Sequence, residues 1–139
     1  MHYLTILNTI VFLGLAALHG YWALGGRRGF AAALPAAPNG TLRLRPSAGM
    51  TWAVALGLLA MSTLSAAHLA FEPGSAPSWM RLADGALALL FALRAVGDFR
   101  YVGLSKRVRD TTFARLDTRY YTPLCLLLAA GCAWLARAA

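Results

Sequence analysis

Residues 94–125 read RAVGDFRYVGLSKRVRDTTFARLDTRYYTPLC, a polar stretch that stands between two apolar runs. It holds seven of the chain's thirteen Lys and Arg residues, together with Asp98, Asp110 and Asp117. Aromatic side chains are interleaved with these charges. If the flanking apolar runs cross a membrane, this stretch and the ends of those runs carry the polar chemistry of the protein.

The composition excludes an ordinary soluble domain. Of the 139 residues, 59% are hydrophobic and 13% are charged, whereas about 25% are charged in typical soluble proteins. A soluble chain of this size could not hide so much apolar surface, because small domains bury a limited fraction of it. We therefore expect an integral membrane protein with a single domain, residues 1–139.

Four apolar runs approach membrane-spanning length, so the sequence predicts an all-α, four-helix transmembrane bundle. The predicted spans cover about residues 3–24, 48–71, 79–98 and 118–138. Between the last two spans we expect a polar loop and a short helix, which Asp110 or Thr111 would cap. Pro123 leaves two possibilities open: the last helix begins there, or it begins earlier, near Asp117, and bends at the proline.

The distribution of positive charge predicts the orientation. With four spans, both termini lie on one side of the membrane, and segments 26–47 and 99–117 lie on the other. The side that holds these segments carries eleven of the thirteen Lys and Arg residues. The positive-inside rule places that side in the cytoplasm and both termini outside it. The net charge is +8. We expect the Lys and Arg side chains that cause it to contact membrane lipids rather than nucleic acid, because no nucleic-acid-binding motif accompanies them.

This topology brings residues that are distant in sequence to one depth at the cytoplasmic end. They come from the end of the first span, the end of the third and the start of the fourth: His19, Tyr21, Trp22, Arg94, Asp98, Asp117, Tyr120 and Tyr121. His68 lies at the opposite end, so the two histidines cannot share a haem. We expect no cofactor and no metal site, because no group of His, Cys and carboxylate residues has metal-ligand spacing.

Three motifs resemble a known family. HGYWALGG at 19–26, RAVGDFRYVGLSKR at 94–107 and TTFARLDTRYYTPLCLLLA at 111–129 are similar to the bacterial membrane family catalogued as domain of unknown function 3995. The resemblance covers nearly the whole chain and implies a compact four-span protein of the bacterial inner membrane, with no established activity. The family pattern has phenylalanine at Leu104 and serine at Thr122. The motif residues that match by position are His19, Tyr21, Trp22, Gly25, Gly26, Arg94, Gly97, Asp98, Phe99, Arg100, Gly103, Lys106, Thr112, Phe113, Asp117, Thr118, Tyr121, Pro123 and Cys125.

The first functional hypothesis is a binding protein or enzyme that acts on an anionic, amphipathic small molecule or lipid from the cytoplasmic side. His19, Asp98 and Asp117 would supply catalytic acid/base or hydrogen-bonding groups. Cationic side chains would hold the negative charge, and aromatic side chains would wall the apolar part. The candidate ligand-binding residues are Tyr21, Trp22, Arg94, Phe99, Arg100, Lys106, Thr112, Phe113, Thr118 and Tyr121.

Structural explanations remain open beside this one. Arg81 with Asp84, and Arg94 with Asp98, have the helical spacing of local ion pairs, and Asp98 could instead bond loop backbone. The chain would then be a structural or regulatory membrane subunit whose polar motif docks a partner. A small transporter is a weaker alternative, because the central portions of the four runs are nearly free of charge. This counts against ion conduction by a monomer and leaves open a homo-oligomer with a central pathway.

Overall fold

The computed structural model describes residues 2–138, in which helices are the regular secondary structure, as the sequence predicts. The long helices are α1 (His2–Ala23), α2 (Ala48–Ala67), α3 (Ser78–Val96) and α5 (Thr122–Ala138). The short helical segments are η1 (Ala31–Ala33), η2 (His68–Ala70), α4 (Thr112–Leu116) and η3 (Asp117–Tyr121). The described residues contain no strand, and one isolated bridge joins Ala36 to Leu42.

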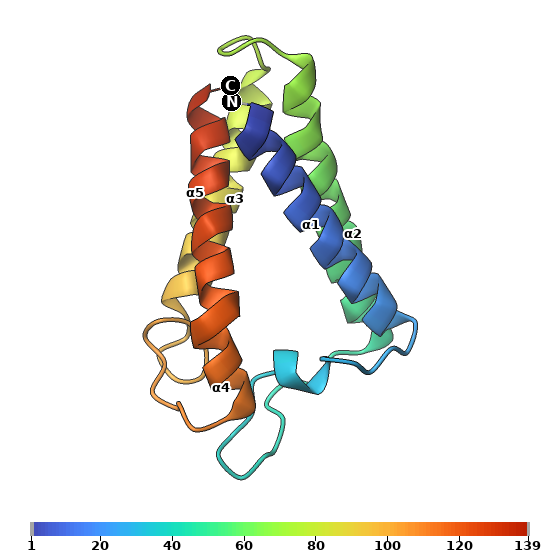
Figure 1. Cartoon of the computed structure of the whole chain (residues 1–139), viewed down its shortest axis with the longest axis vertical. Coiled ribbons are helices and arrows are strands. Elements are labelled where there is room, and N and C mark those ends of the chain that lie inside the picture. The colour runs from blue at the N-terminus through green and yellow to red at the C-terminus, as the bar shows by residue number, and fades with distance from the viewer. Residues whose placement is uncertain (1, 139) are drawn as a thin grey trace.

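The four long helices form two hairpins. α1 packs along α2, and α3 packs along α5, whereas the two pairs contact each other mainly through α1 and α5. The pairs converge at the end where the first and last described residues lie, and they diverge toward the end where η1 crosses between them (Figure 1). The chain is therefore a pair of splayed hairpins rather than a bundle packed along its full length.

The joint between the hairpins is closely packed. Phe12, Leu128 and Cys132 are almost completely buried there, and the rings of Phe12 and Phe91 lie 5.6 Å apart. Gly131 of α5 faces the side chain of Asn8, whose amide occupies the place that a Cβ on this glycine would take. The close approach of α1 to α5 therefore depends on a residue without a side chain.

Away from the joint, the helices expose apolar side chains to their surroundings, among them Ile10, Leu56 and Leu126. Helices that are apolar on their outer faces suit contact with lipid. Three helical segments are long and apolar enough to cross a membrane: His2–Ala23, Ala48–Ala70 and Thr112–Ala138. These three helices indicate a membrane protein.

α3 differs from the other long helices because it carries three charged residues: Arg81, Asp84 and Arg94. The predicted pair between Arg81 and Asp84 is wrong. Asp84 is fully buried in the joint, where its Oδ2 lies 2.6 Å from Nε2 of His68, and Arg81 is exposed. Folding brings His68, which begins η2, from the first hairpin to a carboxylate of the second, a contact that sequence spacing does not reveal.

The last helix begins before Pro123, which resolves the two possibilities that the sequence left open. It starts at Thr112, and Thr111 caps it by accepting a hydrogen bond from the backbone N–H of Ala114 at 3.1 Å. It then widens into the π-turn η3 and continues as α5. Pro123 has no N–H to give to the helix, and its ring would crowd the preceding turn. A wider turn just before it gives the ring more room.

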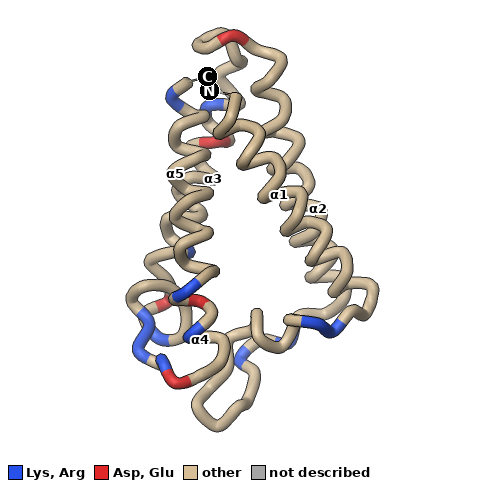
Figure 2. The backbone as a smooth tube through the Cα atoms, viewed as in Figure 1, with Lys and Arg blue, Asp and Glu red and all other residues tan. Residues whose placement is uncertain are grey.

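Charge is distributed unequally between the two ends of the molecule. Most Lys and Arg residues lie at the wide end of the molecule, where the two hairpins diverge. They belong to the loop that contains η1 and to the segment from Arg94 to Arg119 (Figure 2). Arg81 belongs to the first turn of α3 and Arg137 to the last turn of α5. These turns are at the narrow end, where the two hairpins converge and the chain ends lie (Figure 1). The backbone N–H of Gly74 donates to the carbonyl of Ala138 at 2.8 Å, which closes the narrow end.

Candidate functional site

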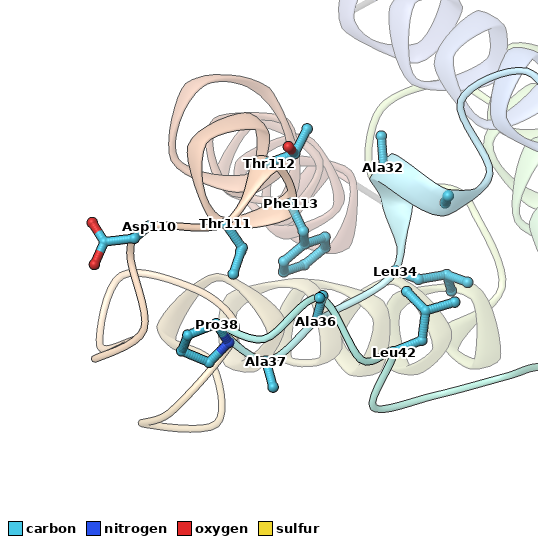
Figure 3. A pocket seen from close by; sticks show the side chains of 12 residues that line it. Ala32, Leu34, Ala36, Ala37, Pro38, Leu42, Asp110, Thr111, Thr112 and Phe113 are labelled. Atoms are coloured by element: carbon cyan, nitrogen blue, oxygen red, sulfur yellow. The ribbon is translucent and has the colours of Figure 1, made fainter.

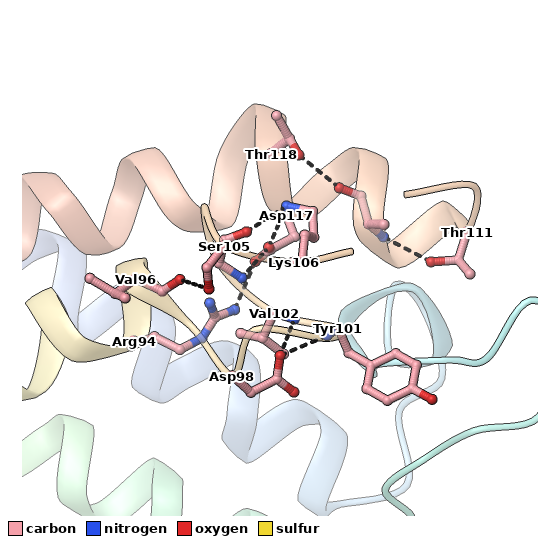
Figure 4. A network of polar contacts seen from close by, with 12 residues as sticks. Arg94, Val96, Asp98, Tyr101, Val102, Ser105, Lys106, Thr111, Asp117 and Thr118 are labelled. Carbon is pink, nitrogen blue, oxygen red and sulfur yellow. Dashed lines mark hydrogen bonds and ion pairs between the residues drawn. The ribbon is translucent and has the colours of Figure 1, made fainter. Parts of the chain in front are cut away.

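A buried carboxylate lies where the polar segment meets the end of α3. Asp117, the first residue of η3, is 0% exposed and accepts three hydrogen bonds. Figure 4 shows it beside Arg94 and Lys106. Its Oδ1 accepts from Nη2 of Arg94, and its Oδ2 accepts from Nζ of Lys106 and from the backbone N–H of Gly103, each at 2.9 Å. Lys106 is itself 3% exposed. Two cations thus share one carboxylate in a site from which water is largely excluded.

The loop after α3 folds back on itself so that Lys106 reaches this carboxylate. Gly97 and Gly103 face each other with φ values of 92° and 81°, a backbone region that side chains disfavour. A Cβ on Gly97 would overlap the carbonyl of Val102, so this approach requires glycine. The backbone N–H of Leu104 then donates to a carbonyl in the last turn of α3 at 2.8 Å and fixes the loop against the helix.

Asp98 organises the outer part of the same loop. Its Oδ1 accepts from the backbone N–H groups of Arg100, Tyr101 and Val102 at 2.9, 2.6 and 2.8 Å. Burial alone would raise the pKa of Asp98, but these N–H groups outweigh it and hold the pKa below its ordinary value of 3.8. The predicted pair between Arg94 and Asp98 is wrong, because Arg94 turns to Asp117 and Asp98 turns to the loop backbone.

A cavity of about 690 Å³ lies between the two hairpins, beside the ion-paired Asp117. All four long helices contribute to its walls, which are mainly apolar. Arg94 lies on the wall, and its Nη1 is buried without a hydrogen-bond partner within the described chain. The lining residues with polar or aromatic side chains are His19, Trp22, Phe30, Thr51, Phe91, Arg94, Tyr121 and Cys125.

The α1 side of the cavity is organised by His19 and Trp22. Nδ1 of His19 lies 2.8 Å from the carbonyl oxygen of Leu15, one turn earlier in the helix. The ring of Trp22 stands edge-on to that of His19, with centroids 5.0 Å apart, and it also contacts the ring of Phe30. The indole Nε1 donates to the carbonyl of Arg28 at 2.8 Å, which holds the loop after α1 against the helix end.

Tyr121 connects the two hairpins at the wide end. Its hydroxyl donates to the carbonyl of Ala32 in η1 over 3.5 Å, and its ring lies 5.9 Å from that of Phe113. A second hollow, of about 500 Å³, lies between the loop that follows η1 and the start of α4 (Figure 3). Phe113, Thr112 and Pro38 line it. η1 and its loop therefore cross between the two hairpins at the wide end of the molecule.

The family described as "Protein of unknown function (DUF3995)" matches residues 12–132, which include the cavity and the buried carboxylate. The chain belongs to the DUF3995 family. Comparisons with curated proteins and with solved structures gave no match. The family assignment therefore carries no activity to this chain, and its own geometry has to provide the argument for function.

The candidate residues fall into three groups in this DUF3995 chain. Four of them line the cavity between the hairpins: His19, Trp22, Arg94 and Tyr121. Two form the ion-paired network beside it: Lys106 and Asp117. Seven lie outside both groups: Tyr21, Asp98, Phe99, Arg100, Thr112, Phe113 and Thr118. Common depth in the membrane predicts the four cavity residues and Asp117, but not Lys106. It also does not separate them from Tyr21 and Asp98 of the third group.

Local contacts explain the positions of the third group. The ring of Tyr21 covers Gly26 at the end of α1. Phe99 is 64% exposed, with a φ of 61°, on the outer face of the loop, and Arg100 beside it is also exposed. The hydroxyl of Thr118 donates to a carbonyl of its own helix at 3.1 Å. These side chains shape the wide end of the molecule without facing the cavity.

The sequence prediction missed the apolar residues that form most of the cavity wall, including Leu15, Leu124, Cys125 and Leu128. Helical periodicity contains a signal for them. Leu15 lies one turn before His19, and Leu124, Cys125 and Leu128 follow Tyr121 at steps that stay on one helical face. Including the residues that share a helix face with each predicted polar residue would have identified these wall residues.

Because Asp98 stabilises the loop as a carboxylate, we expect the loop to loosen in acid. The folded pKa lies below the ordinary 3.8, so the stabilisation is complete above about pH 5 and is lost as pH falls through the lower folded value. Solvent screening keeps the effect below about 1 kcal/mol. Proteolysis within residues 97–110 at about pH 6 and about pH 3 measures it, and Asp98→Asn should abolish the difference. A difference that persists in this variant would assign it to another group, and Asp110→Asn is the control.

Proposed function

We propose that this DUF3995 protein binds an amphipathic molecule with an anionic head, a lipid or a lipid-like small molecule, in the cavity between its hairpins. The observation that carries the proposal is the guanidinium of Arg94. One of its terminal nitrogens is buried without a partner in a cavity whose walls are mainly apolar. Buried donors of this kind are normally satisfied, and an anionic oxygen would satisfy this one.

The charge balance beside the cavity also favours an anion. Arg94 and Lys106 share the single negative charge of Asp117, so the group keeps one net positive charge. The other carboxylate of this region, Asp98, is occupied by the backbone of its loop. An uncompensated charge in a low-dielectric site is costly, and an anionic ligand would neutralise it.

The apolar walls provide for the rest of such a ligand. The volume of about 690 Å³ lies within the range of small-molecule sites, which is roughly 300–1,000 Å³. Leu15, Leu58, Leu124 and Leu128 from three different helices line the cavity. An aliphatic chain held there would replace the side-chain packing that the splayed hairpins lack.

The same reasoning narrows the chemistry. Asp117 already accepts three hydrogen bonds and Asp98 does not face the cavity, so neither is placed to exchange a proton with a ligand. His19 is the remaining candidate for acid/base chemistry among the three predicted catalytic residues. We therefore propose binding as the primary activity, with any proton transfer assigned to His19.

We further propose that α3 is a fourth membrane span and that the wide end faces the cytoplasm of a bacterial inner membrane. The positive charge gathered at the wide end supports this orientation through the positive-inside rule. The 19 residues of α3 match the length of a span, and its buried Asp84 and half-buried Arg94 are both paired inside the protein. The wide end would then also contact anionic lipid headgroups.

The proposal predicts that Arg94→Gln reduces retention of the ligand about tenfold or more, because a charge-assisted hydrogen bond to the head is lost. The measurement is native mass spectrometry of protein extracted gently from its own membrane, with lipid analysis of what remains bound. Arg119→Gln is the matched control, because Arg119 is exposed on the same polar segment. Equal retention by the wild type and Arg94→Gln would contradict the proposal.

A second variant tests the cavity without touching the ion pair. Cys125→Phe adds a ring to the cavity wall and should displace the apolar part of the ligand, whereas Leu126→Phe at the exposed neighbouring position should not.

An empty wild-type protein that retains another polypeptide would favour the structural or regulatory subunit instead. Ion flux through reconstituted protein, with no bound amphiphile, would favour the transporter.

A further inference from the structure

The hydrogen bond of His19 fixes which of its ring nitrogens carries a proton. Nδ1 lies 2.8 Å from the carbonyl oxygen of Leu15. A carbonyl oxygen only accepts, so Nδ1 must be the donor in this contact. In a neutral imidazole, Nε2 is then left without a proton and is a hydrogen-bond acceptor.

That acceptor belongs to a residue of the cavity wall and has no partner among residues 2–138. Its neighbour Trp22 cannot satisfy it, because the indole N–H is used by the carbonyl of Arg28. An acceptor that an apolar ligand group covers loses its hydrogen bond to water and gains nothing in return. A ligand that covers this nitrogen therefore binds more tightly when it brings a donor to His19.

The opposite hairpin presents the complementary group. Arg94 on α3 offers a buried guanidinium nitrogen that lacks an acceptor, whereas His19 on α1 offers an acceptor that lacks a donor. We infer that the ligand is an anionic amphiphile whose head also carries a hydroxyl or another hydrogen-bond donor. This inference rests on the proposed function and adds the donor to it.

Matched fatty acids test the inference directly. Laurate has an anionic head without a donor, and its α-hydroxy and β-hydroxy derivatives add one hydroxyl to the same chain. Dissociation constants are measured for each by titration of the purified full-length protein and native mass spectrometry. We expect the wild type to prefer at least one hydroxylated acid by about tenfold or more, because plain laurate leaves the acceptor unpaired.

Two variants identify the groups responsible. His19→Phe keeps a ring beside Trp22 but removes the acceptor, so the preference for the hydroxyl should disappear while laurate still binds. Arg94→Gln should weaken all three acids and leave their order unchanged. Thermal unfolding of both variants checks that each is folded, and the wild-type comparison stands without them.

The outcomes separate the two proposals. If the wild type binds laurate as tightly as both hydroxylated acids, and Arg94→Gln weakens them all, the hydroxyl inference is overturned and the anionic-amphiphile proposal survives. If no acid binds, or if Arg94→Gln changes nothing, the proposed function fails as well. A hydroxyl preference that His19→Phe retains would assign the acceptor to another residue and would also overturn the inference.

Discussion

Asp117→Asn is expected to lower the free energy of unfolding by about 3–5 kcal/mol, because it leaves two cations without their shared anion. Losing the anion costs more at Lys106 than at Arg94. Lys106 is 3% exposed, and its remaining partner is the carbonyl of Gly103. Arg94 is half-buried and can move toward the cavity. Thermal unfolding in detergent, followed by helical circular dichroism, measures the loss.

Two further variants show whether charge is the cause. Asp110→Asn removes an exposed carboxylate from the same segment and should change stability by less than about 0.5 kcal/mol. Adding Lys106→Gln to Asp117→Asn removes the stranded ammonium and should recover part of the loss. If the double variant is as unstable as the single one, the unpaired ammonium of Lys106 is not the cause of the loss.

His68→Gln is expected to have a similarly large effect, about 3–5 kcal/mol, at the opposite end of the molecule. The contact between His68 Nε2 and Asp84 Oδ2 is 2.6 Å long, the two side chains are 3% and 0% exposed, and Oδ1 of Asp84 has no partner within the described residues. Removing the imidazole therefore leaves the buried carboxyl group of Asp84 without its partner in the joint between the hairpins. Thermal unfolding again provides the measurement.

The two single variants of this pair should differ. Asp84→Asn leaves an amide that can still form a hydrogen bond with the imidazole, so it should cost less than His68→Gln, and the double variant should recover part of the loss. Glu72→Gln, an exposed change near the same end, is the control. A cost of His68→Gln below about 1 kcal/mol would show that the pair is an ordinary neutral hydrogen bond.

Helix positions follow from the sequence because long apolar runs can satisfy their backbone only as helices in lipid. The described ends of α1 and α3 differ by one or two residues from the expected runs. The π-turn before Pro123 was not predicted, because it depends on how the last helix accommodates the proline ring. The splay of the hairpins depends on contacts such as Asn8 against Gly131, which no local pattern encodes.

The candidate site was likewise predicted in part: the membrane depth of its residues was predicted, but not their partners. Membrane depth is a one-dimensional quantity, and it placed His19, Arg94 and Asp117 at one level. It could not separate Asp98 from them, because that carboxylate is drawn away by a loop whose glycines allow the backbone to double back. The partners of Asp84 and Arg94 also came from other elements of the fold, where helical spacing had suggested neighbours on α3.

The division into two hairpins has a consequence for how the protein assembles. Each hairpin joins two long helices that follow one another in the chain, with only η1 between α1 and α2, and α4 and η3 between α3 and α5. Each hairpin can therefore form from nearby sequence. The cavity, by contrast, takes walls from both and exists only after they dock. A ligand bound there favours the docked form by mass action, so its concentration in the membrane would control how much of the chain is fully assembled.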